Sequence, residues 1–95
     1  ERLPASVEEA AYFVVAEALT NVAKYAGASS AEVRIARDHG YAVVEVRDDG
    51  VGGADPAVGT GLRGLADRLA ALDGRLEVHS PEGQGTIVRA EVPCA

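Results

Sequence analysis

The fold of this chain is constrained most strongly by four stretches in which apolar and polar residues alternate. They occur as two pairs, and the members of each pair are close together in the sequence. Residues 31–37 and 41–48 form the first pair, and residues 75–79 and 86–92 form the second. A turn sequence separates the members of each pair, namely Asp38-His-Gly40 and Pro81-Glu-Gly-Gln-Gly85. Because alternation is typical of strands and these connections are short, each pair is predicted to form an antiparallel hairpin.

A helix is predicted before the first hairpin, over about residues 6–26. Ser6 can cap its start, and Glu9 three residues later completes a capping box. No Gly or Pro interrupts the segment before Gly27, which is expected to end it. At the helical period the apolar residues cover one side and a flank, and they leave a narrow polar stripe of Glu17, Asn21 and Lys24.

A second helix is predicted between the two hairpins. Thr60 can cap it, leucines recur at three- and four-residue steps, and Asp73-Gly74 is expected to end it. The preceding residues 49–61 are rich in Gly, Asp and Pro, and a loop of this length usually forms a lid or a binding loop, so we expect it to be mobile. The order helix, hairpin, helix, hairpin predicts a two-layer α/β sandwich, with a largely antiparallel sheet and both helices on one face.

Size and charge limit the functions that are open to this chain. Its 95 residues make one small domain. A net charge of -6 and scattered Lys and Arg residues argue against direct contact with nucleic acid, which needs clustered cations. No apolar run reaches the ~20 residues of a membrane-spanning helix, so we expect a soluble, cytoplasmic domain without direct membrane contact. The only cysteine, Cys94, is expected to be a free surface thiol.

The polar stripe of the first helix is a candidate ligand site. Glu17, Asn21 and Lys24 follow one another at steps of four and three residues, so they face one way. Polar groups on such an apolar helix are costly to bury unless they are hydrogen-bonded or ligated. Mg²⁺ prefers oxygen ligands, so the Asn21 amide can supply one, while Glu17 holds a nearby water and Lys24 neutralises phosphate. The alternative is that the stripe is simply the solvent-exposed side of the helix.

The segment Asp48-Asp-Gly-Val-Gly52 follows the second predicted strand. Because the backbone is fixed at a strand end, the Asp48 carboxylate can accept a hydrogen bond from the exocyclic amine of adenine. Gly50 and Gly52 then let the chain pass the ring without side-chain collision. An ordinary turn at the end of a hairpin is the alternative interpretation, since Asp-Gly is common there. Asp49 is expected to face solvent.

The segment Gly59-Thr-Gly-Leu-Arg-Gly64 opens the second predicted helix. Helix N-termini carry unpaired N–H groups that attract phosphate. The candidate triphosphate contacts are therefore Gly59, Thr60, Gly61, Leu62 and Arg63, with a position facing only solvent as the alternative for Arg63. The segment also spells the dinucleotide-binding fingerprint, but a loop rather than a strand precedes it, which excludes that interpretation.

The fourth glycine-containing segment, Gly83-Gln-Gly-Thr86, lies in the turn of the second predicted hairpin. By itself it is an ordinary turn sequence. Its place after the other three segments makes Thr86 a further candidate nucleotide contact, and the four segments together predict a site for ATP and Mg²⁺. The two histidines, His39 and His79, have no partner at metal-ligand or catalytic spacing and are expected to be structural.

These four segments resemble the ATP-binding domain of sensor histidine kinases, in the superfamily that also includes gyrase, the heat-shock chaperone ATPase and the mismatch-repair ATPases. Residues 17–24 are similar to the N box of that family, and the three later segments are similar to its G1 box, its G2 box and its final glycine motif. The resemblance covers nearly the whole chain and points to the nitrate-sensor and lipid-desaturase-sensor branch. It implies a Bergerat-type ATP-binding fold.

The resemblance also implies a role for the matching residues. Asn21 would be the magnesium ligand, Asp48 would specify adenine, and Gly59 and Gly61 would flank the lid. Glu17 and Lys24 would then serve catalysis, which in phosphoryl transfer is mostly positioning and charge stabilisation. The domain would donate the γ-phosphate of Mg-ATP to a histidine on a separate dimerisation domain, from which it would pass to a response regulator.

The chain departs from the family pattern in two ways. Tyr25 stands where members often carry histidine. A phosphoacceptor histidine and the strand and helix that usually open the domain are expected to lie before Glu1. Residues 1–95 are therefore expected to be the catalytic fragment of a longer sensor kinase, whose parent could be membrane-anchored, and to turn over little ATP alone. The alternatives are an anti-sigma-factor-type serine protein kinase of the same fold and an interaction module that binds no nucleotide.

Overall fold

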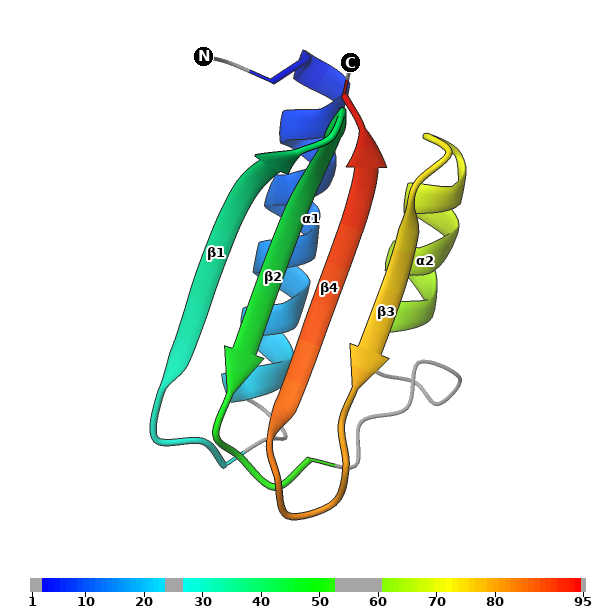
Figure 1. Cartoon of the computed structure of the whole chain (residues 1–95). Coiled ribbons are helices and arrows are strands. Elements are labelled where there is room, and N and C mark those ends of the chain that lie inside the picture. Colours follow the sequence, from blue (N-terminus) through cyan, green and yellow to red (C-terminus); the bar gives the residue numbers. More distant parts are fainter. Residues whose placement is uncertain (1–2, 24–26, 53–60, 95) are drawn as a thin grey trace.

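Four antiparallel strands form one sheet in the order β1-β2-β4-β3 within residues 3–23, 27–52 and 61–94, the part of the chain that the structure describes. The structure is a computed structural model, and Figure 1 shows both helices on one side of the sheet. In chain order the elements are α1 (Ala5–Asn21), β1 (Ala31–Asp38), β2 (Tyr41–Asp48), α2 (Leu62–Ala70), β3 (Arg75–His79) and β4 (Thr86–Pro93). The predicted two-layer sandwich is confirmed.

Both predicted hairpins are present. β1 turns into β2 through His39 and Gly40, whose φ angles of 51° and 83° are those of a two-residue type I′ turn. β3 and β4 form the second antiparallel pair, joined through residues 80–85. The central pair, β2 and β4, joins the two hairpins and places Asp48 opposite Thr86. The ends of strands that are far apart in the sequence are thereby brought together.

The core lies between the sheet and the helices and is aliphatic. Alternate residues of β2 and β4 are buried, namely Ala42, Val44, Val46, Val88, Ala90 and Val92. The two helices contribute Val7, Ala10, Ala11, Val14 and Ala18 from α1 and Leu62, Leu65 and Leu69 from α2. Small side chains on α1 let it pack closely on the sheet, and the leucines of α2 fill the space beside it.

The start of α1 differs from the prediction. The helix begins at Ala5, one residue before Ser6, with Pro4 at the N-cap and no side-chain cap. The N–H groups of Val7 and Glu8 both donate to the Pro4 carbonyl at 3.0 Å, so the backbone closes the first turn without the predicted capping box. Val22 continues the right-handed helical conformation after Asn21. Residues 24–26 lie outside the described part, so the predicted end at Gly27 is not tested.

α2 is shorter than predicted. Gly61 occupies its N-cap position with φ at 84°, and Thr60, the predicted cap, lies outside the described residues. The helix ends at Ala70 because Asp73 takes a positive φ of 60°, and the N–H of Gly74 then donates to the Leu69 carbonyl at 2.8 Å. The predicted stop at Asp73-Gly74 is therefore confirmed. Among the described residues, neither helix combines the length and apolar character needed to cross a membrane.

β1 is unlike the other strands because none of its residues is buried. Val33 and Ile35 lie opposite Val46 and Val44, on the helix-facing side, yet they are 40% and 56% exposed. α1 packs over β2 and β4 and leaves the β1 edge uncovered (Figure 1). The alternation in residues 31–37 thus predicted the strand without predicting how much of it is buried.

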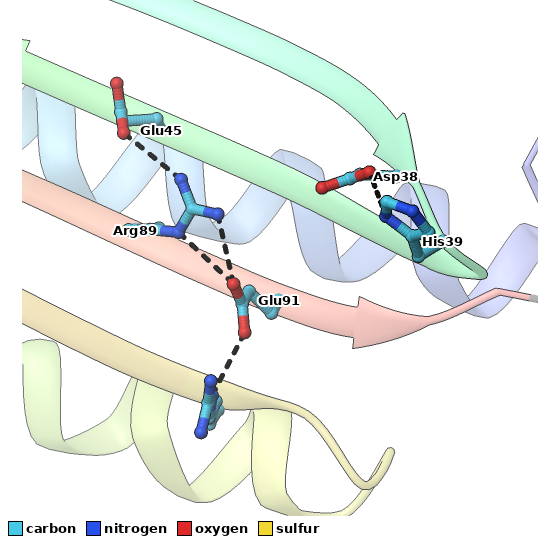
Figure 2. Close-up of polar contacts among 6 residues, drawn as sticks. Asp38, His39, Glu45, Arg89 and Glu91 are labelled. Carbon is cyan, nitrogen blue, oxygen red and sulfur yellow. Dashed lines mark hydrogen bonds and ion pairs between the residues drawn. The ribbon is translucent and has the colours of Figure 1, made fainter.

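The sheet face opposite the helices carries a row of charges across three strands. Arg89 donates to Glu91 at 3.1 Å and lies 3.5 Å from Glu45 (Figure 2). Arg75, on β3, donates to the same Glu91 carboxylate at 3.0 Å. The hydrogen bonds from Arg89 and then Arg75 lower the pKa of Glu91, while the Glu91 carboxylate raises the pKa of Arg89. The pairs of Arg89 with Glu45 and of Arg75 with Glu91 cross between strands, and such pairs suit a solvated sheet face.

Cys94 is free, as expected, but it is buried rather than at the surface. It continues the alternation of Val88, Ala90 and Val92 past the end of β4, and its N–H donates to the Gly40 carbonyl at 2.8 Å. The side chain therefore points into the core. Because the pairing with Gly40 depends on the whole sheet, the local sequence around Cys94 did not indicate that the side chain is buried.

Candidate functional site

The glycine-containing segments and the end of α1 gather at one end of the molecule. α1 and β2 end there, α2 begins there, and the β3–β4 turn lies beside them, at the lower end of Figure 1. In the sequence these segments are separated by the lengths of whole helices and strands. The arrangement of the sheet and the helices therefore brings together the segments that were predicted to act together.

Asp48 is the last residue of β2 and is half-buried. It follows Val44 and Val46 in the alternation, so it faces the helix side of the sheet. Its Oδ1 accepts a hydrogen bond from the Gly50 N–H at 2.8 Å, which fixes the carboxylate in a tight turn. Beside it, the Thr86 hydroxyl lies 2.6 Å from the Ser80 hydroxyl. Asp48 and Thr86 thus form a polar end to an otherwise apolar sheet face.

Backbone contacts without intervening side chains join the turn after β2 to the β3–β4 turn. The Gly83 N–H donates to the Val51 carbonyl at 2.6 Å. Gly52 has a φ of 70°, and a Cβ there would lie 2.9 Å from the Pro81 carbonyl carbon and 3.0 Å from the Gly85 oxygen. Only glycine combines this backbone conformation with so close an approach. The second and fourth glycine-containing segments therefore pack directly against each other.

Glu17 meets the start of α2. A Cβ added to Gly61, whose φ is 84°, would lie 2.6 Å from the Glu17 carboxyl carbon. Glu17 is half-buried, Leu62 is 1% exposed within the core, and Arg63 is exposed. The side chain of Leu62 therefore packs in the core, and only its main chain could contact a ligand. Gly59 and Thr60 lie outside the described residues.

Asn21 is the last residue of α1 and carries a polar atom that is buried without a partner. Its Nδ2 atom makes no hydrogen bond with the described residues. Because an unpaired buried amide costs free energy, this position is suited to a ligand, and a half-turn of the amide would present its oxygen instead. Glu17 and Asn21 are both half-buried, so the first part of the stripe is not simply a solvent-exposed side. Lys24 lies outside the described residues.

The candidate ligand Asn21 fits a metal ion that takes most of its ligands from water and phosphate rather than from the protein. In residues 3–23, 27–52 and 61–94, no three His, Cys, Asp or Glu side chains are grouped so that they could hold a metal ion. An amide oxygen is a suitable hard ligand for Mg²⁺, which usually keeps several waters and binds substrate phosphates. Asn21 fits such a site as the single protein ligand.

Asp49 is exposed, as expected, but it also has a structural role that the sequence did not indicate. Its Oδ1 accepts hydrogen bonds from the N–H groups of Ser29 at 2.8 Å and Ser30 at 3.1 Å. These bonds, that from Ser30 first, lower the pKa of Asp49. Asp49 therefore fastens the segment before β1 to the turn that holds Asp48. The adjacent Asp48-Asp49 pair in the sequence gave no means of distinguishing the two roles.

The sequence also gave no sign of the contact between Phe13 and Arg68. The Arg68 guanidinium carbon lies 4.0 Å from the centre of the Phe13 ring, and the Tyr12 ring meets Phe13 edge to face at 5.5 Å. The contact joins α1 to α2. Spacing along one helix cannot reveal a pair that lies on two different helices.

A family model described as "Histidine kinase-, DNA gyrase B-, and HSP90-like ATPase" matches residues 6–95. The chain is 38% identical over 97 residues to the oxygen sensor histidine kinase NreB of Staphylococcus carnosus, and 36% identical over 99 residues to the sensor histidine kinase MctS of Rhizobium johnstonii. Each match includes 98% of this chain but only 28% and 21% of those proteins. The chain thus spans about a quarter of their length.

Solved structures resemble this one over nearly its full length. The histidine kinase domain of the blue-light activated histidine kinase EL346 from Erythrobacter litoralis has a TM-score of 0.80 and 29% identity, and the match covers 96% of this chain and 46% of that one. The histidine kinase AdeS of Acinetobacter baumannii has a TM-score of 0.75 over 90% of this chain and 46% of that one, at 16% identity, which supports the fold alone.

Proposed function

Because the chain belongs to the family of histidine kinase-, DNA gyrase B- and HSP90-like ATPases, we propose that it binds Mg-ATP at the end of the molecule where α1 and β2 end and α2 begins. The observation that carries this proposal is the buried, unpartnered amide of Asn21. It stands at the same end as the half-buried Asp48 carboxylate. A metal ligand and an acceptor for the adenine amine are the two groups that one nucleotide needs at its opposite ends.

Asp48 recognises the adenine ring. Its carboxylate accepts a hydrogen bond from the exocyclic amine, and the bond from the Gly50 N–H keeps the carboxylate in place while it does so. Gly50 and Gly52 lie along the ring, and Thr86, opposite Asp48 in the sheet, supplies a hydroxyl at the same end. An acceptor at this position favours adenine over guanine, which carries a carbonyl oxygen where adenine carries the amine.

The phosphates lie between the end of α1 and the start of α2. Asn21 supplies the protein ligand to Mg²⁺, and Glu17, which lies against Gly61, orients a water near the metal or the γ-phosphate. Lys24 and Arg63 neutralise phosphate charge. The main chain at the start of α2 supplies N–H donors toward the phosphates, from Gly59, Thr60, Gly61 and Leu62.

The bound nucleotide serves as a phosphate donor. The relatives are sensor histidine kinases of which this chain spans about a quarter, so we propose that residues 1–95 are the catalytic part of such a kinase. The acceptor is a histidine on a separate dimerisation domain of the parent, and a response regulator is the indirect partner. We place the domain in the cytoplasm, where ATP is available. Alone it binds the nucleotide and turns it over little, because the nucleophile is supplied by another domain.

Phosphotransfer to the segment of the parent that carries the acceptor tests this function. The 95-residue protein is incubated with that segment and radiolabelled Mg-ATP. The expected product is labelled protein that loses its label in acid and keeps it in alkali, as the P–N bond of phosphohistidine does. An acid-stable label would indicate a serine phosphoester and favour the serine kinase alternative. The absence of both labelling and Mg-ATP binding would contradict the proposal and favour the nucleotide-free module.

A further inference from the structure

The guanidinium of Arg68 forms a directional contact between the two helices. It lies 4.0 Å from the centre of the Phe13 ring, within the range at which the negative face of an aromatic ring attracts a cation. Tyr12 meets the same ring edge to face, at an interplanar angle of 75°. Phe13 is half-buried and Arg68 is exposed, so the cation covers the outer side of the ring. The contact therefore holds a surface arginine in one place.

This contact lies on the same seam between the helices as the contact between Glu17 and Gly61. Phe13 and Glu17 are four residues apart, which places them on one face of α1. Arg68 follows Gly61 by seven residues, about two turns or 10 Å along α2. The helices thus meet at two points along this seam, where the Glu17 side chain lies against Gly61 at the start of α2 and where Arg68 lies on Phe13 near its end.

The leucines of α2 do not fix its position along α1 in the same way. Leu62, Leu65 and Leu69 are buried against the core, and their burial holds the helix to the domain. Apolar burial is non-directional, so the position of the helix depends on how closely the packed leucines fit the core. A guanidinium stacked on a ring adds a contact with a preferred geometry between the two helices.

We infer that Arg68, through its contact with Phe13, is a positioning residue for the phosphate end of the nucleotide site. It holds α2 in register with α1 and so fixes the N-terminal N–H groups of α2 relative to Glu17 and Asn21. Arg68 itself touches neither the nucleotide nor the metal. The inference rests on the proposed function, and it assigns Arg68 to the phosphate end because α2 meets the proposed site only through its N-terminus.

Titration of Mg-ATP and of adenosine into matched variants tests the inference. Arg68→Gln removes the cation, Phe13→Leu removes the aromatic face but keeps an apolar side chain, and Arg34→Gln is the control. Arg34 is an exposed arginine on β1 that makes no ion pair with the described residues, so the control loses the same charge away from α2. Adenosine carries no phosphate and reports the Asp48 end alone.

Arg68→Gln and Phe13→Leu are each expected to lower the affinity for Mg-ATP about three- to fivefold, which is the factor that corresponds to the loss of an exposed cation–π contact. Adenosine should bind to both as it does to wild type, and Arg34→Gln should leave both ligands unchanged. The double variant should lose no more than either single variant, because both remove one contact. Arg68→Lys should recover part of the loss.

Two results would overturn the inference while leaving the proposed function intact. One is wild-type affinity of Arg68→Gln for Mg-ATP. The other is an equal loss of affinity for Mg-ATP and adenosine, which would assign Arg68 to the general stability of the fold. A wild-type protein that binds adenosine but not Mg-ATP, or neither ligand, would instead contradict the proposed function itself and the inference with it.

Discussion

Gly85 rests directly on the main chain of Asp48. A Cβ at residue 85 would lie 3.1 Å from the Asp48 carbonyl carbon and closer still to its oxygen. The φ of Gly85 is 76°, a conformation that side chains disfavour. The main chain that carries the Asp48 carboxylate is thus in direct contact with the β3–β4 turn. Gly85, in the fourth glycine-containing segment, therefore helps to position Asp48, the residue that we propose to recognise adenine.

Replacing Gly85 by alanine should damage both the fold and the adenine end of the site. Gly83→Ala is the matched control, because Gly83 has a similar φ of 79° but open space where the Cβ would lie. Gly83→Ala should cost about 1 to 2 kcal/mol of unfolding free energy, from the backbone conformation alone. Gly85→Ala should cost a further 1 to 3 kcal/mol or so, from the overlap with Asp48. Urea unfolding measures both, and equal losses would contradict the close contact.

Gly64→Ala should stabilise the protein. Gly64 lies inside α2, is exposed, and has no atom within 4 Å of where its Cβ would stand. Alanine is favoured over glycine in a helix interior by about 1 kcal/mol, so the free energy of unfolding should rise by roughly that amount. Gly61→Ala, three residues earlier, should have the opposite effect because of its positive φ and its contact with Glu17. Thermal unfolding of both variants checks the two signs.

Glu91→Gln should destabilise the protein in a pH-dependent way. The pKa of Glu91 in the folded state lies below its ordinary value of 4.5, because Arg89 and Arg75 donate hydrogen bonds to it. A carboxyl with a lowered folded pKa contributes stability above its ordinary pKa, and the contribution is lost as the pH falls through the folded value. Wild type should therefore be the more stable protein at pH 7, and its advantage should shrink below about pH 4.5.

The advantage from Glu91 should also decrease in high salt, because these pairs lie on the solvated face of the sheet. A difference between wild type and Glu91→Gln that is constant from pH 7 to pH 3 would contradict the proposed role of the two arginines.

The strands and their pairing within each hairpin could be predicted because they follow from local patterns, whereas the pairing of β2 with β4, which joins the two hairpins, was not predicted. The turn at Asp38-His-Gly40 and the alternation on both sides of it need no knowledge of the rest of the chain. The stop of α2 at Asp73-Gly74 was predicted for the same reason, since a positive φ is a property of one residue. The four segments of the site were identified because glycine and polar residues interrupt otherwise apolar elements.

Features that depend on packing between elements could not be predicted in this way. Cys94 is buried because its N–H pairs with Gly40, a residue of the β1–β2 turn that is distant in the sequence. Val33 and Ile35 are exposed because α1 packs mainly over β2 and β4 rather than over β1. The capping box at Ser6 was a sound local pattern, but the Pro4 carbonyl already closes the first turn. For Cys94 and for β1, a neighbour that is distant in the sequence decides the outcome, whereas at Ser6 the nearby main chain decides it.

Calorimetric titration of ATP and ADP, with and without Mg²⁺, tests the central claim that Asn21 and Asp48 hold opposite ends of one nucleotide. Asn21→Ala should abolish the dependence of ATP affinity on Mg²⁺. Asp48→Ala should weaken ATP and ADP alike, by about 10- to 100-fold, since it removes a hydrogen bond to a charged group. Glu9→Ala, which removes an exposed carboxylate near the opposite end of α1, should leave affinity for both nucleotides near that of wild type. Wild-type titrations for both Asn21→Ala and Asp48→Ala would contradict the account.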